Sequence, residues 1–117
     1  MHRVVDRTRG SVLAERCAVA DTFVSRGVGL IGRAGLAEGE ALRITKTNAI
    51  TMLFMRFAID AVFVDRDRRV VRVVERLGPW VPAVLAPRAT EVIELPAGAA
   101  ARAGAQAGDV LEYEPLG

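Results

Sequence analysis

The segment from Phe54 to Asp65 constrains the fold more than any other part of the chain. It reads Phe-Met-Arg-Phe-Ala-Ile-Asp-Ala-Val-Phe-Val-Asp, and most of these residues are of the apolar, β-branched or aromatic kinds that favour strands. A polar turn over 65–68 and a second strand-like run over 69–77 follow directly. Two such runs joined by a short polar turn predict a central antiparallel hairpin.

Other strand-like runs precede and follow this hairpin. They cover residues 3–8, 11–18, 41–45, 90–95 and 110–113, and polar or glycine-containing turns separate them. The apolar length over 50–64 is enough for one bent strand or for two strands joined at a bulge. The chain therefore predicts seven or eight short strands.

Helical periodicity is restricted to two segments. One is a helix at about 21–31, where four residues share a face: Phe23, Gly27, Leu30 and Ile31. Asp21 can cap its first turn, and Gly29 or Gly32 can end it early. The other is a short alanine-rich helix near 98–103.

Many short strands with only two helices predict an α+β fold. We expect one compact domain over 1–117, without a linker or a second domain, because 117 residues suffice for a single core. The largely antiparallel sheet would roll into a barrel-like layer. The main helix would cover about 21–31, and the short helix would lie near 98–103.

The composition excludes several classes of protein. With 51% hydrophobic and 26% charged residues, the chain is typical of globular proteins. It has no apolar run of the roughly 18 residues that a membrane span needs. Met1 to Arg3 lead into charged residues, whereas a signal peptide needs an apolar segment. We therefore expect a cytoplasmic protein that does not associate with membranes.

Single copies of cysteine and histidine limit the chemistry. Cys17 alone excludes an intramolecular disulfide and a multi-cysteine zinc site. His2, at the terminus, is the only histidine that a catalytic triad could use. Asp65 and Asp67 lack the glycine and glutamate of an EF-hand loop. We expect neither a metal nor a cofactor.

The positive charges are spread along the chain, and the net charge is only +2. The arginines do not form the basic block that is typical of a nucleic-acid-binding arm. We therefore do not expect a nucleic-acid partner. Weak nucleic-acid binding through the scattered arginines is the alternative.

One carboxylate interrupts the apolar segment with which the hairpin begins. A buried Asp60 is costly unless an arginine or several N–H groups satisfy it. Arg56 would share its face on an unbroken strand, and Arg26 and Arg33 are the alternative partners. Either Asp60 forms a structural ion pair, or it lines a small polar pocket with one of these arginines and Asp109. In such a pocket the carboxylate could act as an acid or base.

The segment from Gly78 to Pro87 is a loop with an unusual apolar content. Its three prolines exclude a central strand, because proline donates no hydrogen bond to the ladder. Trp80, Val84 and Leu85 either cover the end of the core or form an exposed surface for a ligand or another chain. We expect the first, since large aromatic side chains usually lie in cores. Trp80 is the candidate apolar contact.

Four blocks of residues resemble a known family. They are Gly-Leu-Ile-Gly-Arg at 29–33, the segment 54–65, Val-Ile-Glu-Leu-Pro-Ala-Gly at 92–98 and Ala-Gly-Asp-Val-Leu at 107–111. In this order they are similar to the bacterial and archaeal family called domain of unknown function 192. The resemblance implies a compact domain of mixed strands with a helix before the Gly-Arg block. It implies no established activity.

Two positions depart from that family's pattern. Relatives commonly have a histidine four residues before the methionine at position 55 and a proline after the phenylalanine at position 57. This chain has Thr51 and Ala58 there. A site that used the histidine would lack it here, and Ala58 restores a backbone N–H that proline does not have.

These observations favour a small module that binds a ligand or a protein partner without catalysis. The chain lacks the histidine and cysteine clusters that common enzymatic mechanisms require. The alternative is a small enzyme that uses Asp60 as its acid or base.

Overall fold

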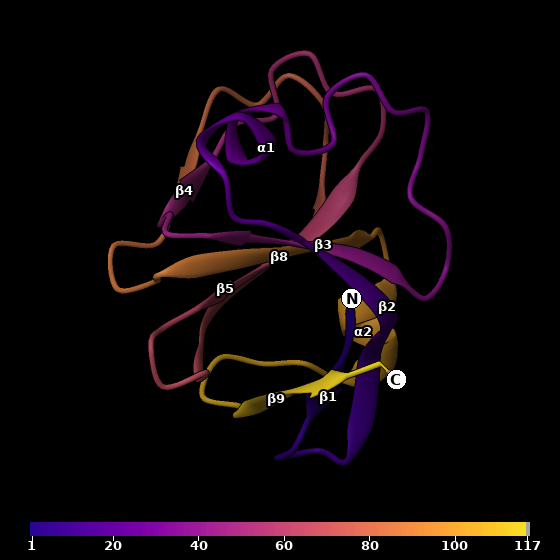
Figure 1. The fold of residues 1–117 in the computed structure, drawn as a ribbon, viewed down its shortest axis with the longest axis vertical. Coiled ribbons are helices and arrows are strands. Elements are labelled where there is room, and N and C mark those ends of the chain that lie inside the picture. Colours follow the sequence, from indigo (N-terminus) through magenta and orange to yellow (C-terminus); the bar gives the residue numbers. More distant parts are fainter. Residues whose placement is uncertain (117) are drawn as a thin grey trace.

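A computed structural model shows that a mixed sheet of seven strands forms the body of the protein (Figure 1). The structure describes residues 1–116, except for the side chains of Phe23 and Val24. The strands are β1 (His2–Asp6), β2 (Ser11–Ala20), β3 (Glu40–Thr45), β5 (Ile59–Val64), β6 (Val70–Leu77), β8 (Glu91–Pro96) and β9 (Leu111–Pro115). Their order across the sheet is β6-β5-β8-β3-β2-β1-β9. A second sheet pairs β4 (Ala49–Ile50) with β7 (Val84–Leu85).

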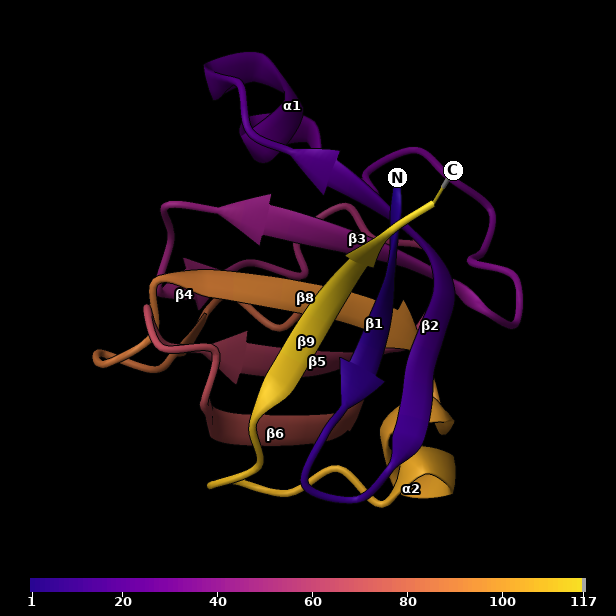
Figure 2. The same ribbon diagram turned by 60° about the horizontal axis from the view of Figure 1, so that its bottom comes forward.

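The large sheet is rolled into a half-barrel, with β9, β1 and β2 crossing the other strands at a steep angle (Figure 2). Strands β2 and β3 pair in parallel, and the other paired strands are antiparallel. The outer strands of the order, β6 and β9, approach each other at one end, where Arg69 and Val110 form a bridge. The predicted α+β fold, with a largely antiparallel, barrel-like sheet in one compact domain, is therefore confirmed.

The central strands β5 and β8 separate two hydrophobic cores. All residues of β5 are buried. Because side chains alternate across a strand, Phe63 joins the first core, whereas Val62 and Val64 join the second. The first core lies beneath the loops and the small sheet and includes Met52 and Val84. The second core is covered by α2 (Ala99–Ala103), which lies where the alanine-rich segment predicted it.

The first helix, α1 (Phe23–Val28), is shorter than the predicted helix at about 21–31. Thr22, and not Asp21, is its N-cap and accepts a hydrogen bond from the backbone N–H of Ser25. The helix ends at Gly29, as one of the alternatives predicted. The predicted apolar face included Phe23, whose side chain lies outside the described residues. No helix within the described residues is long and apolar enough to cross a membrane.

The segment over 50–64 forms neither one bent strand nor two strands joined at a bulge, because a loop over 51–58 separates β4 from β5. In this loop Met52 bonds to the neighbouring loop through both backbone groups. Its N–H donates to the carbonyl oxygen of Val81 at 2.9 Å, and its carbonyl oxygen accepts from the N–H of Trp80 at 2.8 Å. Phe54 has a positive φ of 66°, which is incompatible with an extended strand.

Candidate functional site

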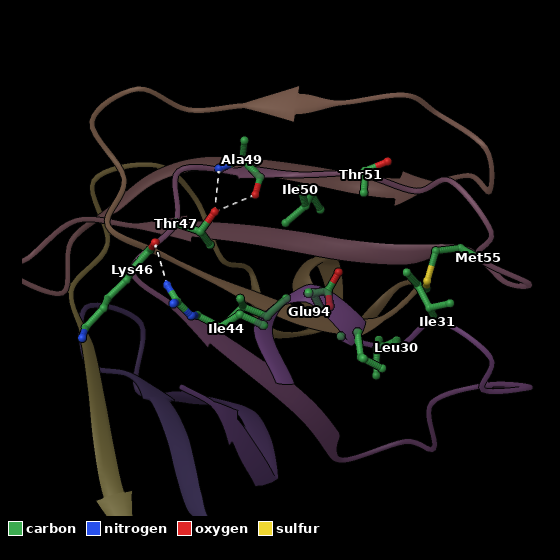
Figure 3. A pocket seen from close by; sticks show the side chains of 14 residues that line it. Leu30, Ile31, Ile44, Lys46, Thr47, Ala49, Ile50, Thr51, Met55 and Glu94 are labelled. Atoms are coloured by element: carbon green, nitrogen blue, oxygen red, sulfur yellow. Dashed lines mark hydrogen bonds between the residues drawn. The ribbon is translucent and has the colours of Figure 1, made fainter. Parts of the chain in front are cut away.

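A cavity of about 390 Å³ lies between α1, the small sheet and the large sheet (Figure 3). Its walls are mainly apolar and include Leu30, Ile44, Ile50 and Met55. Exposed residues such as Val28 also line it, so the cavity is open to solvent. A pocket of this size and character suits a small organic molecule.

Glu94 on β8 supplies the buried charge of this cavity. Its side chain lies centrally among the residues that line the cavity (Figure 3), and the residue is only 4% exposed. Its Oε1 atom has no hydrogen-bond partner. In the ladders Glu94 is opposite Leu42 on β3 and Ala61 on β5, so apolar neighbours surround it in the sheet. Burial raises the pKa of Glu94 to about 7.

Gly29 allows the backbone after α1 to pass close to this carboxyl group. Its φ is +51°, which side chains rarely adopt. A Cβ atom placed there would lie 3.7 Å from Cδ1 of Ile44 and 3.8 Å from Oε1 of Glu94. A side chain at position 29 would therefore contact both Ile44 and the carboxyl group of Glu94.

The polar groups near the mouth are a guanidinium and a hydroxyl. Arg26 donates from Nη1 to the carbonyl oxygen of Lys46 at 3.5 Å. Thr51 is exposed, and its Oγ1 accepts a hydrogen bond from the N–H of Leu53 at 3.1 Å. Thr51, the position at which the family resemblance implies a histidine, lies on the lining of the cavity.

Asp60 lies on β5 with its side chain directed away from the Glu94 cavity, toward the second core. It is fully buried, and its carboxylate accepts three backbone N–H bonds. They come from Arg76 at 2.8 Å, Gly98 at 3.0 Å and Ala100 at 2.9 Å. The alternative in which several N–H groups satisfy this carboxylate is the one that the structure shows.

None of the three arginines considered for Asp60 makes an ion pair with it in the described part of the chain. Arg56 is exposed in the loop that interrupts the expected strand, so the shared face that the spacing predicted does not exist. Arg26 bonds to backbone carbonyl oxygens. Arg33 lies 3.8 Å from a carboxylate oxygen of Glu40.

Asp109 belongs to a different cluster, at the end of the half-barrel where β6 and β9 meet. It accepts hydrogen bonds from Nε and Nη2 of Arg9 at 3.0 and 3.2 Å. The buried carboxyl of Asp6 is its neighbour, and Oδ2 of Asp6 has no hydrogen-bond partner. Burial and the neighbouring Asp109 raise the pKa of Asp6 to about 6. The structure thus places Asp60, Arg56 and Asp109 in three separate surroundings.

Trp80 is 58% exposed, so the expectation that it covers the core is wrong. Val84 from the same loop is buried, whereas Leu85 is exposed. Trp80 packs edge to face against the exposed Phe54, with ring centroids 5.1 Å apart. The backbone N–H of Trp80 bonds to the carbonyl oxygen of Met52, and the residue has a positive φ of 68°.

Glu94 was not among the candidate site residues predicted from the sequence. One signal was available. Strand β8 lies in the middle of the sheet, and a strand that is buried on both faces reads as a continuous apolar run. Glu94 interrupts such a run between Ile93 and Leu95. Within the described residues, no three His, Cys, Asp or Glu side chains gather as a metal ion would need.

The chain is similar over most of its length to other proteins. The model of the family DUF192, described as uncharacterized ACR, matches residues 4–113. A UPF0127 protein of Thermococcus sibiricus (strain DSM 12597 / MM 739) is 33% identical over 115 residues, which cover 95% of this chain and 74% of the relative.

Solved structures share the fold. A protein of unknown function from Novosphingobium aromaticivorans DSM 12444 superposes with a TM-score of 0.84 at 27% identity, over 96% of this chain and 84% of that one. A proposed transcription regulator from Sinorhizobium meliloti 1021 gives a TM-score of 0.80 at 20% identity, over 96% and 91% of the two chains. At that identity the second likeness shows the fold alone. The family match and the 33% identical relative show that the chain belongs to the DUF192 family.

Proposed function

We propose that this protein is a small-molecule-binding module and that the Glu94 cavity is its binding site. The observation that carries the proposal is the unpartnered Oε1 atom of Glu94, buried beside an apolar cavity that opens to solvent. Buried polar atoms in folded proteins nearly always have a partner. A bound ligand would supply the partner that the protein does not.

We also assign to Glu94 the role of acid or base in any proton transfer that this protein catalyses. Burial brings the pKa of Glu94 to about 7, where a carboxyl can both give and take a proton near neutral pH. Asp60 is occupied by three backbone N–H groups, which supports a structural role for it. We place ligand binding first because Glu94 is the one carboxyl group among the described residues that line the cavity.

A thermal-shift screen of small metabolites tests the binding function. A ligand that binds the folded state raises the midpoint of unfolding in proportion to RT ln(1 + [L]/Kd). We expect the shifts found with wild type to be lost in Glu94→Gln, which removes the charge, and in Thr51→Trp, which places an indole at the mouth of the cavity. Glu75→Gln, an exposed carboxylate on β6, is the matched control and should keep them. Shifts that persist in both cavity variants would rule out this site.

A further inference from the structure

The charged residues of the Glu94 cavity lie at different depths from the protein surface. Within the described part of the lining, Glu94 is the one buried charge, whereas Lys46 is exposed and Arg26 is partly exposed. The inner end of the cavity is therefore acidic and apolar, and its outer end is basic. A ligand that fits must match both ends.

The inner end calls for a hydrogen-bond donor. Oε1 of Glu94 accepts nothing from the protein, and solvent screens an ion pair only weakly at this depth. A charged donor gains more here than a neutral one, because charge-assisted hydrogen bonds are roughly twice as strong. One unpartnered oxygen suits the compact ammonium group better than the planar fork of a guanidinium. An anionic group would be repelled.

The outer end disfavours a second positive charge. The guanidinium of Arg26 donates to the backbone carbonyl oxygens of Thr22 at 3.3 Å and Lys46 at 3.5 Å. Neither partner is a carboxylate, so these bonds leave its charge unneutralised. A cationic group at the mouth would meet this guanidinium, whereas an anionic group would be attracted to it.

We propose, on the basis of the cavity assigned above as the binding site, that its ligand is a small amphipathic amine. The primary ammonium donates to Oε1 of Glu94, and an apolar chain or ring lies against Leu30, Ile44, Ile50 and Met55. The outer end of the ligand is uncharged or anionic. An ω-amino acid with an apolar spacer has this combination of groups.

Binding of such an amine requires ionised Glu94. Below the pKa of Glu94, the carboxyl proton must pass to the solvent as the ammonium enters, and no covalent bond forms or breaks in the ligand. Affinity therefore rises with pH through about 7. Isothermal titration in two buffers with different heats of ionisation counts the protons that are released.

Five probes with the same six-carbon chain separate the possible classes. They are hexylamine, 6-aminohexanoate, 1,6-diaminohexane, hexanoate and hexan-1-ol. With wild type we expect hexylamine and 6-aminohexanoate to bind with proton release below pH 7. We expect 1,6-diaminohexane to bind about tenfold more weakly because its second ammonium meets Arg26, and hexanoate not to bind.

Two variants reverse these preferences. Glu94→Gln should abolish amine binding and proton release but retain hexan-1-ol, whereas Arg26→Glu should make 1,6-diaminohexane the best probe. Glu75→Gln is the control. The number of protons released by wild type is measured on the unaltered protein, so it tests the proposal even if a variant fails to fold.

Different results would contradict the assignment of the cavity as the binding site and the assignment of the ligand as an amine. Binding of hexylamine or hexanoate that Thr51→Trp removes and Glu94→Gln leaves unchanged would overturn the amine class and leave the cavity as the site. Equal affinities of wild type for hexylamine and 1,6-diaminohexane would contradict the proposal that the outer end of the ligand is uncharged or anionic. Absence of binding by all five probes would overturn both the class and the site.

Discussion

Ala100 donates its backbone N–H to the carboxylate of Asp60 at 2.9 Å, although the two residues lie 40 positions apart in the sequence. The same carboxylate accepts from Gly98, which precedes α2, and from Arg76 on β6. Arg76 has a positive φ of 51° and lies where the pairing of β5 with β6 is irregular. Asp60 therefore joins β5, the irregular end of β6 and the start of α2.

Removing the charge of Asp60 should destabilise the fold. In Asp60→Asn an amide nitrogen would face backbone N–H groups that need an acceptor, and leaving buried donors unsatisfied costs about 2–4 kcal/mol in the free energy of unfolding. Urea denaturation followed by circular dichroism measures this. Asp67→Asn, in an exposed turn, is the matched control and should change the stability little. A loss for Asp60→Asn no larger than that of the control would contradict the anchoring role.

The Glu94→Gln variant should change how stability depends on pH. The folded protein holds the Glu94 proton more tightly than the unfolded chain, because burial raises the pKa from 4.5 to about 7. The stability that Glu94 contributes is therefore complete below about pH 4.5 and is lost as the pH rises through about 7. Relative to wild type, the free energy of unfolding of Glu94→Gln should increase by about 3 kcal/mol across this window. Denaturation at several pH values measures the difference, and parallel curves would refute it.

The carboxyl pair of Asp6 and Asp109 should respond unequally to the same substitution. Burial, followed by the neighbouring carboxyl group of Asp109, raises the pKa of Asp6. For Asp109, burial is outweighed by its neighbours, including the hydrogen bonds from Arg9 and the N–H of Gln106, and its pKa is lowered. Asp6 is thus the member of the pair that keeps its proton to the higher pH. Near pH 5, Asp6→Asn keeps a neutral side chain and should be tolerated, whereas Asp109→Asn should lower the midpoint of urea denaturation. Equal effects would argue against this division of roles.

Tyr113, the only tyrosine, should resist ionisation while the protein is folded. Burial raises its pKa, and the hydrogen bond that its hydroxyl donates to Glu91 raises it further. Its ring also lies 4.4 and 4.0 Å from the guanidinium carbons of Arg43 and Arg68. Absorbance of the phenolate should remain absent about one pH unit above the ordinary value of about 10. It should appear together with the loss of circular dichroism, and an earlier appearance would show that the ring is accessible.

Lys46 should be less favourable than glycine at its position. Its φ is 54°, and the left-handed region costs a residue with a Cβ atom roughly 1–2 kcal/mol. We expect Lys46→Gly to be about 1 kcal/mol more stable than Lys46→Ala, since both remove the charge and only glycine relieves the strain. Arg88, exposed and without a positive φ, is the control position, where alanine should be the more stable of the two. Chemical denaturation compares the four variants.

Local patterns predicted those elements that neighbouring residues define. The hairpin of β5 and β6 follows from two apolar runs around a polar turn, and α2 follows from alanines between Gly98 and Gly104. Strand alternation and turn chemistry act over only a few residues, so they can be read from the sequence. The same patterns failed at 51–58. There the backbone of Met52 bonds to a loop almost thirty residues later in the chain.

The sequence by itself determined the fold class, the family and the alternation of side chains between the two faces of each strand. Only the tertiary structure decided what covers each face. Gly29, Ile44 and Met55 come together around Glu94 from distant segments, and Gly98 and Ala100 reach Asp60 from beyond β8. Burial and hydrogen-bond partners depend on these long-range contacts, and they determine whether a carboxylate is an anchor or part of a binding site.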